Sequence, residues 1–301
     1  MTTPQPIYFT MMLTKFRASQ AFNLGAIALL LLSCSGGEPS APDAALDATA
    51  DGATETGTLE FRANGEDFVR QGFVSKDGWQ IDFDNLYVHL SEVEAYQADA
   101  AYDPDSGKPA DPAAVAAVAE AVTVDLAAGD AQADPVLIKS VSAPAGQYTA
   151  LSWSMSPAPS GPAAGSTLML VGTATKEGES VPFTIQLDPE YTYNCGEFVG
   201  DARKGILTAD GQADVEATFH FDHVFGDGEA PADDDINTGA VGFGPFAELA
   251  GADGLKVDMA TLAQSLSPEN YSKLEEALIG LGHVGEGHCS EVSADHTHDS
   301  K

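Results

Sequence analysis

The sequence predicts a mainly β protein, with an antiparallel β-sandwich over residues 58–225 followed by a short helical C-terminal region. Between Thr58 and Phe225, apolar residues recur at every second position in short runs. Clusters of Gly, Pro and Asp separate these runs, a pattern typical of short antiparallel strands joined by turns. After Phe225 the alternation stops, and apolar residues recur at helical spacing.

Each expected strand is short and places its apolar side chains on one face. The strands we expect are residues 58–62, 86–90, 122–126, 147–153, 167–173, 181–187 and 215–225. One helix is expected among them. Asp111 and Pro112 precede an Ala-rich stretch that runs to Ala121, which predicts a short helix with Asp111 as its N-cap and Pro112 at its first position.

The chain after the sandwich, residues 226–291, is expected to form an acidic loop and short helices that pack on the sandwich. The loop covers residues 226–244, and the helices are expected at 245–250, 257–266 and 268–281. Ser267-Pro268 is a start signal for the last helix, and Gly282 is a stop signal. Residues 292–301 are expected to be a disordered tail that carries His296 and His298.

The charge balance excludes several classes of protein. The 301 residues include 13 Lys and Arg against 46 Asp and Glu, a formal net charge of -33. Such a surface repels nucleic acids and anionic lipid headgroups, so the expected charged partners are divalent cations. The length allows a sizeable core, and three cysteines are too few for a disulfide-built scaffold.

The amino terminus has the pattern of an export signal. Lys15 and Arg17 precede an apolar run from Leu24 to Leu32, which is too short to span a membrane and is typical of a secretory signal. Leu31-Leu32-Ser33-Cys34 resembles a bacterial lipobox, in which the cysteine becomes the acylated amino terminus. We therefore expect a signal peptide over 1–33 that starts at Met1, Met11 or Met12, and a disordered acidic tether over 34–57.

Part of the sandwich resembles a known family. The segments concerned are FDNLYVHLSEVEAY (83–96), VTVDL (122–126) and PAGQYTAL (144–151). They are similar to a bacterial lipoprotein domain of unknown function with a transthyretin-like sandwich. The resemblance covers about residues 58–155 and implies a non-enzymatic β-sandwich. It implies no site residues.

Two histidine groups predict a metal site. On a continuous strand, His220 and Asp222 share one face, and His223 is a reserve ligand if the strand ends or bulges there. His283 and His288 lie in a glycine-rich loop that could bend both rings toward one point. Such a nitrogen-rich set is typical of Zn²⁺ or Cu²⁺. The alternatives are that His220 is a solvated strand residue and that His283 caps the preceding helix.

The other two cysteines are expected to form a disulfide. Cys195 and Cys289 are the thiols left besides Cys34, and a lone pair beyond the inner membrane is usually bridged. The alternative is thiolate ligation of a metal. A bridge would fix the position of His288, which is next to Cys289.

The acidic loop is a candidate calcium site. Its oxygen ligands lie close together in the sequence, at Asp227, Glu229, Asp233, Asp234, Asp235 and Asn237. Calcium accepts flexible loops of this kind, although the spacing differs from that of an EF-hand. The alternative is an ordinary solvated loop.

The sequence as a whole predicts an exported lipoprotein that is anchored by Cys34 to the cell envelope membrane. We expect it at the outer membrane, on the periplasmic or surface face, and binding zinc or copper. The sequence has no Gly-x-Ser-x-Gly or His-Glu-x-x-His motif, so we expect no enzymatic activity. The alternatives are a structural or adhesive surface lipoprotein without metal and a metal-dependent hydrolase.

Overall fold

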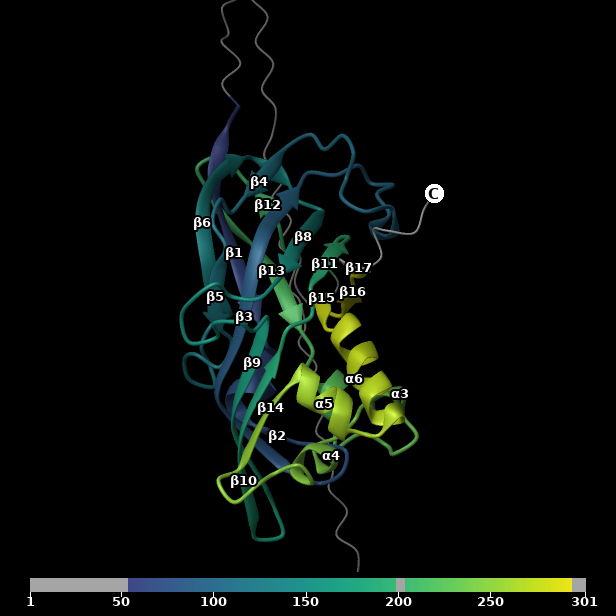
Figure 1. Ribbon diagram of the computed structural model, residues 1–301. Coiled ribbons are helices and arrows are strands. Elements are labelled where there is room, and N and C mark those ends of the chain that lie inside the picture. The colour runs from purple at the N-terminus through teal and green to yellow at the C-terminus, as the bar shows by residue number, and fades with distance from the viewer. Residues whose placement is uncertain (1–53, 199–203, 294–301) are drawn as a thin grey trace, which may run out of the picture. The chain divides into compact units, whose positions relative to one another are not determined.

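The computed structural model describes residues 54–198 and 204–293, excluding the His288 side chain. Over this range the protein is mainly β, with sheets in a sandwich-like arrangement and short helices toward the C-terminus (Figure 1), so the predicted fold class is confirmed. The predictions for the signal peptide, for Cys34 and for His296 and His298 lie outside the described residues. The tether was expected to reach residue 57, but the first strand begins at Thr56.

The smaller of the two large sheets has five strands in the order β16-β15-β13-β1-β6. These are β1 (Thr56–Asn64), β6 (Val136–Pro144), β13 (Gln212–Phe219), β15 (Gly282–Val284) and β16 (Gly287–His288). The pair β1 and β13 is parallel, from Thr58 opposite Gln212 to Asn64 opposite Thr218. Both strands therefore end at the same edge of the sheet.

The larger sheet is built around the long strand β3 (Gln80–Tyr96). Its main order is β14-β10-β9-β3-β8-β11-β17, and β2, β4 and β5 also pair with β3. The further strands are β2 (Phe73–Val74), β4 (Val115–Ala117), β5 (Val122–Asp125), β8 (Ala150–Met155), β9 (Leu168–Lys176), β10 (Glu179–Leu187), β11 (Tyr191–Cys195), β14 (Leu255–Asp258) and β17 (Ser290–Ser293). A small third sheet pairs β7 (Gly146–Gln147) with β12 (Ile206–Leu207).

The core follows from the period of two. In β1, Leu59, Phe61 and Ala63 are buried while their neighbours are more exposed. In the larger sheet, Trp153 stacks on Tyr193 with ring centroids 5.3 Å apart. Removing such apolar surface from water contributes roughly 25 cal/mol per Å², so the inward residues of both sheets bind the layers together.

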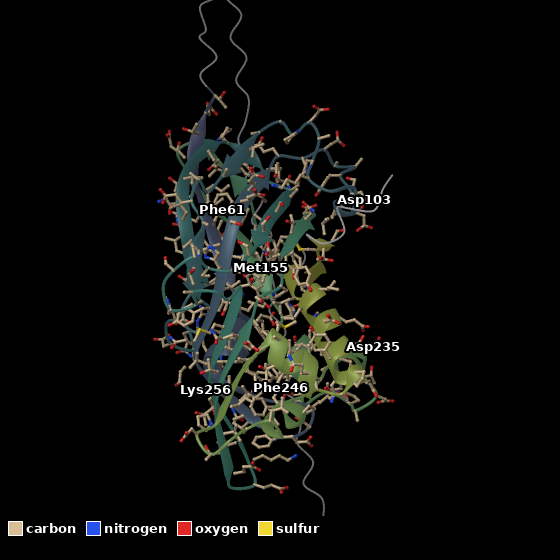
Figure 2. All side chains as sticks on the ribbon, viewed as in Figure 1. Phe61, Asp103, Met155, Asp235, Phe246 and Lys256 are labelled. Carbon is tan, nitrogen blue, oxygen red and sulfur yellow. A yellow bond between two sulfur atoms is a disulfide. The ribbon has the colours of Figure 1, made fainter. Side chains whose placement is uncertain are left out.

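Short helices lie between the strands along the chain. They are α1 (Glu66–Gln71), the 3-10 helix η1 (Pro104–Ser106), α2 (Asp222–Phe225), α3 (Asp235–Gly239), α4 (Gly244–Ala247), α5 (Met259–Ser265) and α6 (Pro268–Ile279). Helices α3 to α6 gather on one side of the strands (Figure 1). Phe246 of α4 lies inside this region and Asp235 of α3 at its outer edge (Figure 2). None of the described helices is long and apolar enough to cross a membrane.

Several local predictions need correction. The Ala-rich stretch is strand β4, because it pairs with β3 and buries Ala116 and Val118. The strand expected to reach Phe225 ends at Phe219 and gives way to α2. The helix expected at 257–266 begins at Met259, since β14 occupies the preceding residues.

The C-terminal region also adds strands to both sheets. Strands β14 and β17 join the larger sheet, and β15 and β16 join the smaller one. Strand β14 lies parallel to β10, so the sandwich contains two parallel pairs rather than antiparallel pairs alone. The predicted start of the last helix at Ser267-Pro268 is confirmed, and the Ser267 side chain caps it by accepting a hydrogen bond from the Asn270 N–H. The helix was expected to run to Leu281 and stop at Gly282, but it ends at Ile279 with Gly280 as its cap.

Candidate metal centre

A cluster of histidines lies where β1 and β13 end. Glu66 follows β1 by two residues, and His220 directly follows β13. His283 lies in β15, whose pairing with β13 sets it opposite Thr218. Segments far apart in the sequence therefore meet at this edge of the smaller sheet.

The turn after β13 brings two histidines to the same place. The His220 N–H donates to the Leu281 carbonyl over 3.1 Å, which ties this turn to the end of the α6 region. Phe221 and Phe225 are fully buried and anchor α2 in the core. As the chain turns into α2, the His223 N–H donates to the His220 carbonyl over 3.3 Å.

Three imidazoles converge here. Among the residues that the structure describes, His220, His223 and His283 form the group whose candidate ligand atoms all lie within 4.8 Å of one another. The His220 and His283 rings stack with centroids 4.0 Å apart and planes at 22°. The His223 centroid lies 5.6 Å from that of His220 and 5.2 Å from that of His283. His220 and His283 are buried and His223 is half-buried, so an ion held here would be largely shielded from water.

The tautomer of His283 follows from its hydrogen bond. Its Nε2 lies 3.0 Å from the Gly280 carbonyl oxygen, and a carbonyl only accepts, so Nε2 carries the hydrogen. The Nδ1 lone pair of the neutral ring is then the one that can bind a metal. The expected capping role of His283 is therefore present, since Gly280 is the cap residue of α6, and it is compatible with ligation through the other nitrogen.

Two carboxylates flank His220. Glu66 Oε1 lies 3.5 Å from His220 Nε2, and Asp222 Oδ1 lies 4.0 Å from His220 Nδ1. Burial, followed by the negative charges of Asp222 and Glu286, raises the pKa of the Glu66 carboxyl to about 7. The environment of Glu66 therefore disfavours its charged form, and a nearby cation would reverse that preference.

Two grooves reach the centre. His223 lines a groove of about 380 Å³ whose wall includes Asp235 and Glu276. Asp222, the preceding residue, lines another of about 390 Å³ that includes Phe68 and Glu229. The centre is thus accessible to solvent on the side of His223, the half-buried histidine, which lies in α2.

The structure brings together most of the predicted ligands, although not for the predicted reason. His220 and Asp222 lie close at the start of a helix turn, not on one strand face, because β13 ends at Phe219. His223, expected as a reserve, belongs to the cluster. The His288 backbone pairs with that of His283, and its role as a ligand stays a prediction. Sequence reasoning missed Glu66, since the parallel pairing of β1 with β13 has no local signal.

The predicted disulfide is present. Cys195 and Cys289 are bonded across a sequence separation of 94. The bond joins the end of β11 to the residue between β16 and β17, and β17 itself pairs with β11. It therefore anchors the C-terminal strands beside the histidine cluster.

The acidic loop is organised by its own hydrogen bonds. Asn237 is buried, and its Oδ1 accepts from the Asp227 N–H over 2.9 Å. Its amide nitrogen donates to the carbonyls of Asp227, Ala230 and Pro231. The loop's described carboxylates form no group with the close spacing of the histidines. Calcium binding by Asp227, Glu229, Asp233, Asp235 and Asn237 stays a prediction, and Asn237 has a structural role.

Comparisons with protein families, with curated proteins and with solved structures give no match to this chain. The resemblance of residues 58–155 to a transthyretin-like lipoprotein domain thus stays a prediction.

Proposed function

We propose that this protein is an exported, lipid-anchored protein of the cell envelope that binds a divalent transition metal, zinc or copper, through His220, His223 and His283. The observation that carries the metal proposal is the convergence of three imidazoles, two of them buried, from segments about sixty residues apart. The export and anchoring part rests on the sequence from Lys15 to Cys34.

The donor set favours transition metals over calcium. Imidazole nitrogens are common ligands of zinc and copper, whereas calcium takes six to eight oxygen ligands. Asp222 and Glu66 beside His220 add negative charge that favours a dication. His283 is already oriented as metal-binding histidines commonly are, since a backbone carbonyl accepts a hydrogen bond from its Nε2.

Calorimetric titration of Zn²⁺ and Cu²⁺ into the purified protein tests this function. All variants carry His296→Ala and His298→Ala, which remove binding by the tail. In that background His220→Ala and His283→Ala should each weaken binding at least tenfold, and His288→Ala tests the remaining predicted ligand. His89→Gln is the matched control, because His89 is also buried but pairs with Thr123. Equal affinity in His220→Ala, His283→Ala and the unmutated site would overturn the proposal.

A second function, metal-dependent hydrolysis, is favoured by one observation. The groove lined by His223 gives a three-histidine centre an accessible side, and catalytic zinc sites combine three protein ligands with an open position. The zinc-loaded protein should then hydrolyse activated ester or phosphoester substrates, with loss of turnover in His220→Ala. Absence of turnover in a zinc-loaded protein leaves metal binding alone as the function.

A further inference from the structure

We infer that Glu66 is a positioning residue of this metal centre, whose carboxylate holds the His220 ring through Nε2 so that Nδ1 is the atom offered to the ion. The inference rests on the proposed function. It adds a residue from α1 that lies more than 150 positions away from the histidines in the sequence.

The first observation is the contact itself. Glu66 Oε1 lies 3.5 Å from Nε2 of His220, and the Glu66 side chain is 26% exposed. On the opposite side of the ring, Nδ1 faces Asp222 Oδ1 at 4.0 Å. With a cation in the centre Glu66 is ionised, and an ionised carboxylate beside Nε2 favours the tautomer with hydrogen on that nitrogen. Glu66 therefore sets which nitrogen of His220 has its lone pair available.

The second observation is that His283 has an oxygen beside the same ring nitrogen. Its Nε2 is against the Gly280 carbonyl, and its ring stacks nearly parallel to that of His220. Both buried rings of the cluster thus have an oxygen beside Nε2: the Gly280 carbonyl accepts a hydrogen bond from His283, and the Glu66 carboxylate lies within ion-pair distance of His220. Metal-bound histidines commonly donate their second N–H to a carboxylate or a backbone carbonyl, so Glu66 supplies to His220 what Gly280 supplies to His283.

The third observation is the backbone of Glu66. Its φ is +64°, in the left-handed region that disfavours residues with a Cβ. The Asn64 side chain holds it there, because Asn64 Oδ1 accepts from the Glu66 N–H over 2.8 Å while Asn64 Nδ2 donates to Glu216. Backbone strain of this kind persists where the surroundings impose it, and it concentrates at functional sites.

The other non-glycine residues with positive φ include two in tight turns. Glu177 lies between β9 and β10 beside Gly178, and Asp210 lies between β12 and β13. A turn accounts for φ there. Glu66 instead opens a helix and directs a carboxylate at a histidine, where glycine would satisfy the backbone without strain.

Substitution by glycine separates positioning from a structural role. Glu66→Gly relieves the strain and removes the carboxylate, so the metal-free protein should unfold at the same or a higher temperature. Its Zn²⁺ affinity should fall about 10- to 100-fold. Glu177→Gly, which relieves strain in a turn, is the matched control and should leave Zn²⁺ affinity unchanged. Glu66→Gln keeps an oxygen acceptor and should recover part of the lost affinity.

Cobalt spectroscopy separates positioning from direct ligation. The d–d absorption bands of Co²⁺-loaded Glu66→Gln should keep their positions, because the atoms that bind the ion are unchanged. A shift of these bands would make Glu66 a ligand and overturn the inference. Unchanged Zn²⁺ affinity in Glu66→Gly, or a lowered unfolding temperature of that metal-free variant, would also overturn it while the proposed function stands. If the protein with an intact site binds no metal, the proposed function and the inference fall together.

Discussion

Burial alone does not make a histidine of this chain a metal-ligand candidate. His89 in β3 is as buried as His220, but its Nδ1 lies 2.9 Å from the Thr123 hydroxyl. Among the described residues, it does not belong to the histidine cluster. His220 and His283 differ because their rings stack on each other, and His220 also lies beside two carboxylates. The groups that surround each imidazole ring, and not its exposure, distinguish a core histidine from a candidate ligand.

The pH dependence of stability should include a contribution from His89. Burial lowers its pKa, so the folded state binds the proton less readily than the unfolded state, whose pKa is about 6.5. The stabilisation present above that value is therefore lost as the pH falls through 6.5 toward the folded pKa. In urea unfolding at pH 7.5 and pH 5.5, His89→Gln should lose less stability on acidification than wild type. Equal losses in both proteins would contradict this assignment.

Strand β15 places His283 through close packing at its neighbour Gly282. A Cβ at position 282 would lie 2.6 Å from Cδ1 of Tyr193. That ring is fully buried, and its hydroxyl donates to the Leu278 carbonyl over 2.7 Å. The ring cannot move without losing this bond, so β15 needs glycine here.

Gly282→Ala should therefore destabilise the protein by about 1–3 kcal/mol, the usual cost of overpacking. It should also weaken metal binding, because His283 is the next residue. Gly239→Ala in α3 is the control, since a Cβ there meets nothing within 4 Å, and alanine is the better helix former. Chemical denaturation and zinc titration of both variants check this. A Gly282→Ala protein as stable as Gly239→Ala would contradict this prediction and show that the Tyr193 ring can move to make room for the methyl group.

The disulfide should stabilise both the fold and the centre. It joins β11 to the C-terminal strands across a separation of 94 residues, and loss of such a bridge typically costs about 2–5 kcal/mol. We expect the Cys195→Ser/Cys289→Ser double variant to lose this much in denaturant unfolding. It should also bind Zn²⁺ more weakly, because Cys289 N–H donates to the Gly282 carbonyl beside His283. Unchanged zinc affinity in the folded double variant would show that the disulfide does not support the metal centre.

The elements that the sequence predicts well are those with a local pattern. Residues 58–62 and 181–187 alternate cleanly and are strands in the structure. The prediction of a helix in the Ala-rich stretch was wrong, because pairing with β3 overrides helix propensity. The predicted end of β13 was wrong. Phe219 and Phe221 are both buried, so their two-residue spacing looks like a continuing strand and conceals the change to a helix.

The candidate site was predictable in composition but not in geometry. The two histidine groups are visible in the sequence, and the structure brings His220, His223 and His283 together. Glu66 was not predictable, because its place depends on the parallel pairing of β1 with β13. Non-local pairing of that kind is fixed by tertiary packing, which no short motif records.

The proposed anchoring of the whole molecule depends on one residue. Cys34 lies two residues after the apolar run from Leu24 to Leu32, and acylation there would hold the protein to a membrane by lipid alone. Cys34→Ala should move the exported protein from the membrane fraction to the soluble fraction. Fractionation with amino-terminal sequencing checks this. A variant that stays with the membrane after processing would contradict the lipoprotein assignment.

The net charge of -33 should make metal capture depend on ionic strength. A field of this sign attracts dications over long distances and can raise association rates about 10-fold or more. Screening lengths fall from roughly 30 Å at 0.01 M salt to about 3 Å at 1 M. At the proposed site, dissociation would depend instead on contacts with His220, His223 and His283, which salt would screen little because the site is largely buried.

The Zn²⁺ association rate should therefore fall steeply between 0.01 M and 1 M NaCl while the dissociation rate changes little. Stopped-flow mixing gives the first rate, and displacement by a chelator gives the second. His220→Ala is the control, because it keeps the acidic surface and weakens the site, so ions attracted by the surface alone remain in its signal. If salt acts mainly on dissociation, the ion is held by the exposed carboxylates rather than by the buried imidazoles. That result would place the metal on the acidic surface and away from the edge where β1 and β13 end.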